Sequence, residues 1–366
     1  MDRLTELEPA RLRRLQRVGI LSGFAAGAWL GAAEAPTKLV TLGVPPVIIS
    51  FMMVLGVFLA RWSLPALIRG TAAVRDDVRH APHLVIWAAL AGCLWAVANT
   101  LTIFAIRDIG LAIAFPLWNA NSLLGILWGT MYIPYRKAYL TGMHPLSFVA
   151  FFTIGELGMM TALALSFSGG AGPLWRALVA SHAALFWLLL AGFVWVVGDL
   201  FQQFAAKYVG ISRGIPLSNT NQLWGLLWGI LVFGELAGGA GGGGGRGAVI
   251  AGSLLMALGA GAIALASAPG REHRRWLEAA ARESERYGVD PAYVAAGMAG
   301  DAARVRRRPL DWTLVGGATA LLVGSAAIAQ VPALPLAWGW VAALTLALLA
   351  FLAAGGVALW RATRFG

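Results

Sequence analysis

The sequence predicts an all-α, polytopic membrane protein of about ten transmembrane helices, six of which form an inverted-topology repeat. Three observations predict this fold class. Apolar residues make up 59% of the 366 residues and charged residues only 12%, whereas a soluble domain is about 25% charged. Basic residues gather in alternate loops, and one sequence pattern recurs at a constant spacing.

Apolar segments long enough to cross a bilayer follow one another along the chain. We expect ten spans, at about 18–35, 43–62, 83–105, 110–133, 145–168, 183–206, 213–234, 247–267, 311–329 and 335–360. The predicted organisation is a basic N-terminus (1–17), an eight-helix core (18–267), a basic loop (268–310) and a C-terminal two-helix hairpin (311–366).

Arginine and lysine residues predict the orientation of these spans. They gather in the N-terminal segment and in the loops after the second, fourth, sixth and eighth spans, with Arg61 and Arg69 assigned to the loop after the second. The opposite loops hold few, namely Lys38, Arg107, Arg176 and Arg246. The positive-inside rule then places both termini in the cytoplasm, with the chain in the cell (inner) membrane. Loop arginines therefore account for the net charge of +11, and no nucleic-acid partner is expected.

Three segments outside the spans have distinct compositions. Residues 238–247, "GGAGGGGGRG", predict a flexible linker. The basic loop contains "REHRRWLEAAARESERYG", which predicts a short amphipathic helix that lies on anionic lipid or, alternatively, docks a partner. Residues 1–35 have some features of a signal peptide, but acidic residues in the long charged segment argue against cleavage.

The recurring pattern has a period of 100 residues. Residues 116–129, "PLWNANSLLGILWG", match residues 216–229, "PLSNTNQLWGLLWG". The match extends over about 83–168 and 183–267, so three spans are copied. Because three is odd, the second copy enters the membrane from the opposite side. Inverted repeats of this kind are typical of secondary transporters, which bind substrate between the two copies.

Equivalent positions of the two copies hold the same prolines, glycines and asparagines. Pro116 and Pro216 either interrupt their helices or begin them. The glycine pairs predict close helix packing; they are Gly125 with Gly129 and Gly225 with Gly229. Amides in hydrocarbon need partners, so these side chains either bond between helices or contact substrate; they are Asn119, Asn121, Asn219, Asn221 and the neighbouring Gln222.

A second polar face runs along the spans at 83–105 and 183–206. Trp195, Asp199 and Gln202 share one face of the later span, and Trp95 and Asn99 hold the matching positions of the earlier one. A carboxylate within a span is costly and usually functional. Asp199 is therefore a candidate proton carrier, with a structural ion pair to Lys207 as the alternative.

Two further acidic residues differ in their predicted surroundings. Glu156, halfway along the span at 145–168, is the second candidate for proton coupling. Glu34 lies near a span end, from which we expect it to reach water.

Tryptophans surround these polar positions. Trp95, Trp118, Trp195 and Trp224 would stack on the apolar face of a sugar ring or on a flat organic cation. Packing within the bundle or at the membrane interface is the alternative for each.

The two copies resemble the drug/metabolite transporter superfamily, and most closely its glucose/ribose porter (sugar uptake) branch. The resemblance lies in "AGCLWAVANTLTIFAIRDIGLAIAFPLWNANSLLGILWG", in the second copy ending "GILVFGEL", and in "WLGAAEAPTK" at 29–38. It implies ten helices in two inverted halves, a central substrate path and transport commonly coupled to protons. The chain departs from that order, since only residues 169–182 separate the copies and two spans trail at the C-terminus.

The function we expect is a secondary transporter of a small polar metabolite, with sugar as the class that the resemblance implies. The alternatives are an exporter of drug-like or amphipathic molecules and a non-transporting membrane scaffold or sensor. We find no metal-ligand spacing, nucleophile elbow or phosphate loop, so the sequence predicts neither an enzyme nor a cofactor. The expected partners are the bilayer, the substrate and a coupling proton or ion, and the sequence leaves the oligomeric state open.

Overall fold

The protein is helical throughout the part of the chain that the structure describes. The computed structural model describes residues 8–40, 43–110, 113–114, 126–235, 244–266, 269–299, 307–330 and 334–363. No strand occurs among these residues, so the predicted all-α class is confirmed for them. Among the described helices, seven are long and apolar enough to cross a membrane, as in a polytopic membrane protein. They are α1 (Pro9–Val40), α2 (Pro46–Ile68), α4 (His83–Ile109), α7 (Pro145–Ser168), α9 (Leu185–Val209), α15 (Pro309–Ala327) and α16 (Trp338–Thr363).

The remaining helices are shorter or more polar. They are α3 (Thr71–His80), α6 (Ile126–Leu140), α8 (Ala171–Ala180), α10 (Ile211–Ser218), α11 (Asn221–Leu227), α12 (Gly244–Leu265), α13 (Pro269–Tyr287) and α14 (Pro291–Ala299). The helix predicted within the basic loop is therefore confirmed as α13.

Three of the ten predicted spans are not among the seven long apolar helices. The span at 213–234 is divided into α10, α11 and a π-helical segment (Trp228–Val232). The span at 110–133 lies partly outside the described residues, and α6 begins at Ile126. The span at 247–267 corresponds to α12, whose apolar part, Gly247–Ile263, is shorter than the other seven.

Close helix packing forms the centre of the bundle. Helix α9 packs against α1 and α2, and α7 packs against α2 and α4. Glycines permit these approaches: a Cβ at Gly92 would overlap the carbonyl of Phe152, and one at Gly155 would overlap the carbonyl of Ala89. Between α2 and α9, Gly192 has the same role, since the Met53 carbonyl lies against it. Small residues therefore set the helix separations, as is common in membrane bundles.

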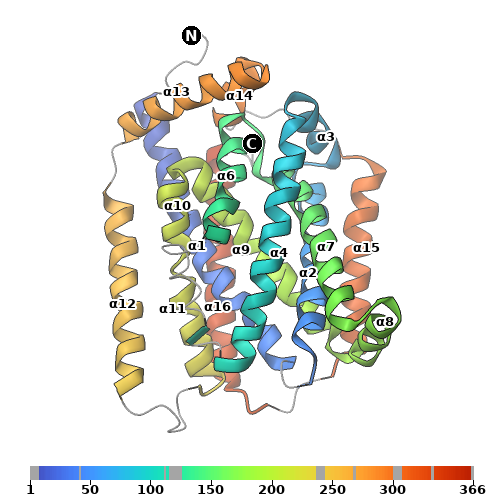
Figure 1. The fold of residues 1–366 in the computed structure, drawn as a ribbon. Coiled ribbons are helices and arrows are strands. Elements are labelled where there is room, and N and C mark those ends of the chain that lie inside the picture. The colour runs from blue at the N-terminus through green and yellow to red at the C-terminus, as the bar shows by residue number, and fades with distance from the viewer. Residues whose placement is uncertain are drawn as a thin grey trace.

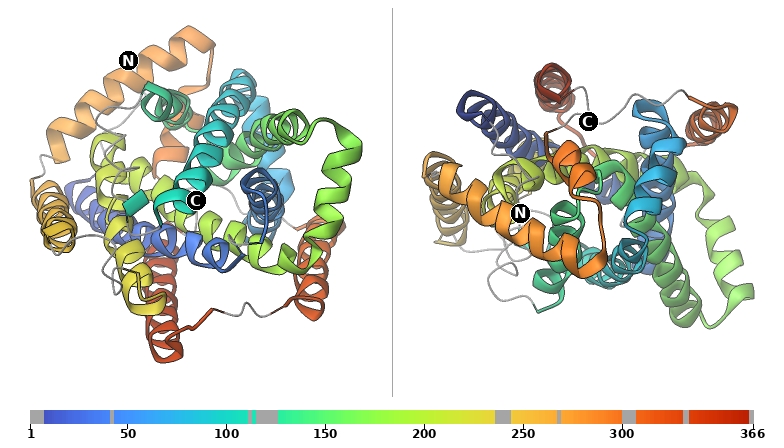
Figure 2. Two further views of the ribbon diagram at one scale, coloured as in Figure 1. Left: turned by 60° about the horizontal axis from the view of Figure 1, so that its bottom comes forward. Right: turned by 90° about the horizontal axis from the view of Figure 1, so that it is seen from above.

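The start of α1 and the end of α16 lie at one end of the bundle, which we call the terminal end (Figure 1). There Arg14 of α1 donates a hydrogen bond to the carbonyl of Arg361 in α16. Helix α13 crosses this end, whereas α12, α15 and α16 lie at the periphery (Figure 2). At the opposite end, Lys38 forms an ion pair with Glu235, with 2.8 Å between Nζ and Oε1.

Helices α4 and α9 run in opposite directions. Helix α4 ends at the opposite end of the bundle, where Gly110 lies near Glu235. Helix α9 ends at the terminal end, where Val209 lies against Gly19 of α1. Each helix is followed by a glycine in the left-handed region, with φ of 80° at both Gly110 and Gly210. Two segments related by the sequence repeat thus end in the same way but point oppositely.

We predict that Gly155→Ala destabilises the protein by about 1–3 kcal/mol, because the added methyl group overlaps the backbone of α4. Gly158→Ala is the matched control, since it lies on the same helix and nothing lies within 4 Å of its Cβ position. Alanine should leave stability unchanged there or raise it by up to about 1 kcal/mol. Thermal unfolding in detergent measures both, and equal melting temperatures for the two variants would contradict the packing described here.

Candidate functional site

Three charged side chains from three helices meet inside the bundle. The Arg61 guanidinium of α2 donates through Nη1 to Glu156 Oε2 of α7, at 2.5 Å, and through Nη2 to Asp199 Oδ2 of α9, at 2.8 Å. All three side chains are at most 1% exposed. We call Arg61, Glu156 and Asp199 the charged triad. It joins the two carboxylates that the sequence singled out, which lie in different copies of the repeat.

The assignment of Arg61 to a cytoplasmic loop is wrong. Helix α2 continues to Ile68, so Arg61 lies inside a span rather than after it. The predicted span ended at residue 62, directly after Arg61, although apolar residues continue beyond it. That apolar continuation was the signal that the arginine is buried. The charged partner of Asp199 is consequently Arg61 rather than Lys207.

Aromatic rings enclose the triad. The Arg61 Cζ lies 4.3 Å from the ring centroid of Phe152 and 5.0 Å from that of Trp195. Trp195 in turn meets Trp95 with 4.7 Å between ring centroids and an interplanar angle of 64°. Cation–π contacts add to the stabilisation of a desolvated guanidinium.

The contact between Trp95 and Trp195 joins equivalent positions of the two copies. Because α4 and α9 run in opposite directions, the residues four positions further on lie on opposite sides of this pair. Asn99 is therefore displaced by about 6 Å toward the opposite end, and Asp199 by about 6 Å toward the terminal end. Neither amide atom of the buried Asn99 has a hydrogen-bond partner among the described residues.

A line of hydrogen bonds leads from the triad toward the terminal end. Asp199 Oδ1 accepts a hydrogen bond from Gln203 Nε2 at 2.8 Å. Gln203 Oε1 accepts one from the Tyr139 hydroxyl. The sequence had placed Gln202 on this face, but the Gln202 amide bonds to the Ser218 hydroxyl instead. Gln203 follows Asp199 by one helical turn, which a strict 3.6-residue pattern also allows.

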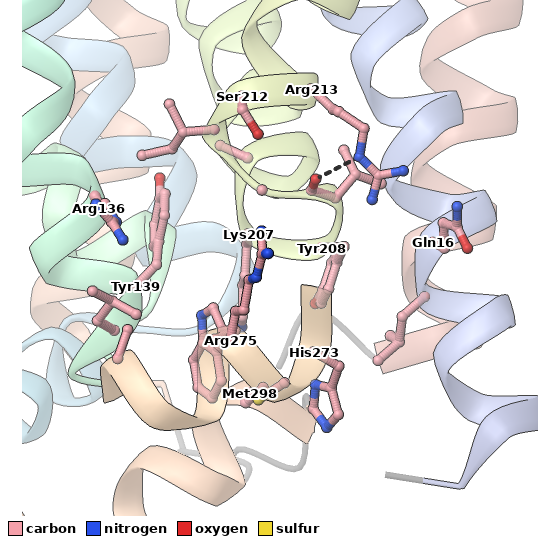
Figure 3. Close-up of a pocket in the computed structure, with 18 of the residues that line it drawn as sticks. Gln16, Arg136, Tyr139, Lys207, Tyr208, Ser212, Arg213, His273, Arg275 and Met298 are labelled. Carbon is pink, nitrogen blue, oxygen red and sulfur yellow. Dashed lines mark hydrogen bonds between the residues drawn. The ribbon is translucent and has the colours of Figure 1, made fainter. Parts of the chain in front are cut away.

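Tyr139 borders a cavity of about 680 Å³ at the terminal end, between the bundle and α13 (Figure 3). The lining residues come from α1, α6, the junction of α9 and α10, α13 and α14. Among the described residues predicted to bind substrate, none lines this cavity. The line Asp199–Gln203–Tyr139 therefore connects the buried triad with a space outside the predicted substrate residues.

The other predicted amides lie apart from the triad, where α10 and α11 pack against α1. Helix α10 contains Pro216 in its last turn, and a turn at residues 219–220 separates it from α11. A proline supplies no N–H, so it weakens the helix that contains it. Asn221 and Gln222 are buried in α11, and neither amide atom of Gln222 has a partner among the described residues. Asn219 and Trp224 are partly exposed.

The predicted packing glycines have two outcomes. Gly225 lies at a close approach, since its backbone nitrogen borders the position that a Cβ on Gly31 of α1 would occupy. Gly229 lies buried in the π-helical segment, and Gly129 lies in α6. The other predictions in this region fall outside the described residues, namely those for Pro116, Trp118, Asn119, Asn121 and Gly125.

Glu34 is buried rather than solvated. Its side chain is 0% exposed, and Oε2 accepts a hydrogen bond from the Thr37 hydroxyl at 2.8 Å. The interpretation that it reaches water is wrong because α1 extends to Val40, beyond the predicted span end. Glu34 and Arg61 are therefore charged residues within the long apolar helices whose burial the sequence analysis did not predict.

Comparisons with models of protein families, with curated proteins and with solved structures found no match for this chain. The resemblance to the drug/metabolite transporter superfamily therefore remains a prediction.

We predict that Arg61→Met destabilises the protein by about 3–5 kcal/mol, because it leaves two carboxylates buried without a counter-charge. The triple variant Arg61→Met, Glu156→Gln, Asp199→Asn should recover much of that loss, since no charge remains to desolvate. Arg79→Met, at an exposed position, is the control. Thermal unfolding in detergent compares them, and an Arg61→Met variant as stable as the control would contradict the triad.

Proposed function

We propose that this chain is a secondary transporter that moves a small polar metabolite across the membrane by alternating access, with sugars as the first class to test. The charged triad is the observation that carries the proposal. Ionisable groups within membrane spans are expensive and are usually retained for transport or proton relay. Here three of them meet on α2, α7 and α9 with almost no exposure.

The formal charge of the triad provides a coupling mechanism. One guanidinium faces two carboxylates, so the set carries one excess negative charge. Binding of one proton neutralises the set and weakens one of the two ion pairs that join α2 to α7 and α9. Proton occupancy then biases how these helices pack, which is the requirement for linking a proton gradient to alternating access.

An inverted repeat is the second part of the proposal. The opposite directions of α4 and α9, their matching glycine ends and the contact of Trp95 with Trp195 support it. So does the broken helix at α10–α11, since discontinuous helices commonly form the substrate sites of such transporters. Two similar copies in opposite orientation allow inward-open and outward-open states of similar energy.

The side chains around the tryptophan pair support the proposed substrate class. Trp95 and Trp195 are buried rings in contact with each other, and the amide of the buried Asn99 lacks a partner among the described residues. A sugar would satisfy both, because hydroxyl groups pair with an amide while the C–H face stacks on a ring. The same rings, together with Phe152, would also suit a flat amphipathic molecule, so export of such compounds is the second candidate.

We predict that Asp199→Asn abolishes uptake driven by a pH gradient, because the amide cannot take up and release the coupling proton. Exchange of labelled for unlabelled substrate should persist, since exchange needs no net proton movement. A thermal-shift screen of sugars and amphipathic cations first identifies a ligand. Proteoliposomes that contain the protein and are loaded with that ligand then measure uptake and exchange.

Ser166→Ala is the control for this experiment, since Ser166 is an exposed residue of α7 outside the triad. Accumulation by Asp199→Asn at the wild-type level would remove Asp199 from the coupling mechanism. Failure of the wild-type protein to exchange any compound of the panel would argue against a transporter.

We also predict that the ends of α4 and α9 face opposite sides of the membrane, with the terminal end in the cytoplasm because it carries most of the basic residues. Asp108→Cys and Ser212→Cys, each in a Cys93→Ala background, place one exposed thiol at each end. An impermeant maleimide added to intact cells should label Asp108→Cys alone. Labelling of both positions from one side would contradict the inverted arrangement.

A further inference from the structure

The cavity at the terminal end is a pocket with walls from six helices. Its volume of about 680 Å³ lies within the range of about 300–1,000 Å³ that small-molecule sites occupy. Helix α1 supplies Gln16, α6 supplies Arg136, and the junction of α9 and α10 supplies the stretch from Lys207 to Arg213. Helix α13 closes the pocket from outside the bundle (Figures 2 and 3).

The polar lining of the pocket is strongly basic. Four cationic side chains and one histidine reach it from four helices, and they are Arg136, Lys207, Arg213, His273 and Arg275. Figure 3 shows them distributed around the cavity rather than gathered on one wall. No carboxylate is among the described residues that line it. Several cations held around one concave space, with no anion in its wall, strongly favour an anionic ligand.

The neutral groups of the pocket include hydrogen-bond donors, which would contact the charged group of an organic anion, and apolar side chains, which would contact its carbon skeleton. Helix α10 begins in its wall directly after Gly210, so the first N–H groups of that helix and the Ser212 hydroxyl add donors beside the cations. The apolar lining includes Leu12, Trp276 and Met298, which would contact a carbon skeleton. The pocket therefore has a cationic part and an apolar part.

Helix α13 is held over the pocket by contacts of its C-terminal half. Lys137 of α6 donates to the Tyr287 hydroxyl at 3.2 Å and pairs with Glu283 at 3.5 Å. The Tyr287 ring stacks on His83 with 3.9 Å between centroids. The half of α13 that contains His273 and Trp276 then extends over the pocket.

Helix α14 anchors the same segment a second time. The Tyr293 hydroxyl donates to Asp77 Oδ1 at 2.8 Å, and its ring stacks on His80 at 4.3 Å. Burial and the neighbouring Asp77 carboxylate raise the pKa of Tyr293 well above its usual value, so the hydroxyl remains a donor. The cover of the pocket is thus a fixed part of the fold rather than a loose basic loop.

We propose that this pocket binds a phosphate-bearing organic molecule, whose phosphate contacts Lys207, Arg213 and the start of α10 while α13 covers its carbon part. A phosphate monoester carries about −1.5 to −2 charges and three acceptor oxygens. It can therefore pair with several converging cations at once, whereas a carboxylate has one charge and two oxygens. The ligand is either a soluble phosphorylated metabolite or the headgroup of an anionic lipid. Binding at this pocket does not depend on whether the chain transports a sugar, because none of the described residues predicted to bind a transported substrate lines it.

Binding of one headgroup in soluble and lipid form tests the proposal. Titration calorimetry on the full-length protein in phosphatidylcholine nanodiscs measures glycerol 3-phosphate against glycerol. Thermal unfolding in nanodiscs with and without phosphatidic acid measures the lipid form. We expect one of the two phosphate ligands to bind, glycerol to show no binding, and Lys207→Gln, Arg213→Gln to weaken binding at least tenfold.

Two further double variants keep the test decisive. Arg136→Gln, Arg275→Gln changes exposed positions of the pocket and should weaken binding even if the inner pair impairs folding. Arg75→Gln, Arg79→Gln removes the same charge from exposed positions of α3, outside the pocket, and should bind as the wild type does. Binding of the soluble ligand alone or of the lipid alone supports the proposal and identifies the source. Absence of both, or equal loss in the α3 variant, overturns it.

Discussion

The ion pairs of Arg61 with Glu156 and Asp199 are the interaction on which the rest of the bundle depends. Burial of three charges costs several kcal/mol for each ion, and only mutual contact and hydrogen bonds offset that cost. The three helices that carry them must therefore keep their positions to within a few tenths of an ångström. Glycines at the crossings of α2 with α9 and of α4 with α7 permit that precision, because they bring backbones into direct contact.

Polar groups extend from this centre in one direction. Gln203 and Tyr139 continue the hydrogen bonds of Asp199 to the basic pocket at the terminal end. Toward the other end lie the tryptophan pair and Asn99, and neither amide atom of Asn99 has a hydrogen-bond partner among the described residues. The carboxylate in one copy and the amide in the other thus make the bundle electrostatically asymmetric.

Part of the site followed from sequence patterns. Glu156 and Asp199 were singled out because carboxylates are rare within apolar spans, and Trp95 with Trp195 because equal spacing placed them on matching helix faces. Their meeting at one arginine did not follow, because side-chain periodicity describes one helix at a time. Arg61 and Glu34 were misassigned for a simpler reason: a charge near the end of an apolar run was taken as a helix end, whereas both helices continue beyond it.

The sequence by itself determined the all-helical membrane class and the repeat that relates α4 to α9, since composition and spacing are properties of the chain alone. It also predicted α13, because an amphipathic period is local. The tertiary structure alone decided which charges pair, how the predicted span at 213–234 divides into α10 and α11, and where α13 lies. These features depend on residues as far apart in the sequence as Arg61 and Asp199, which form an ion pair, or Tyr139 and Trp276, which line one pocket. Contact between such residues is set by packing, which no local pattern encodes.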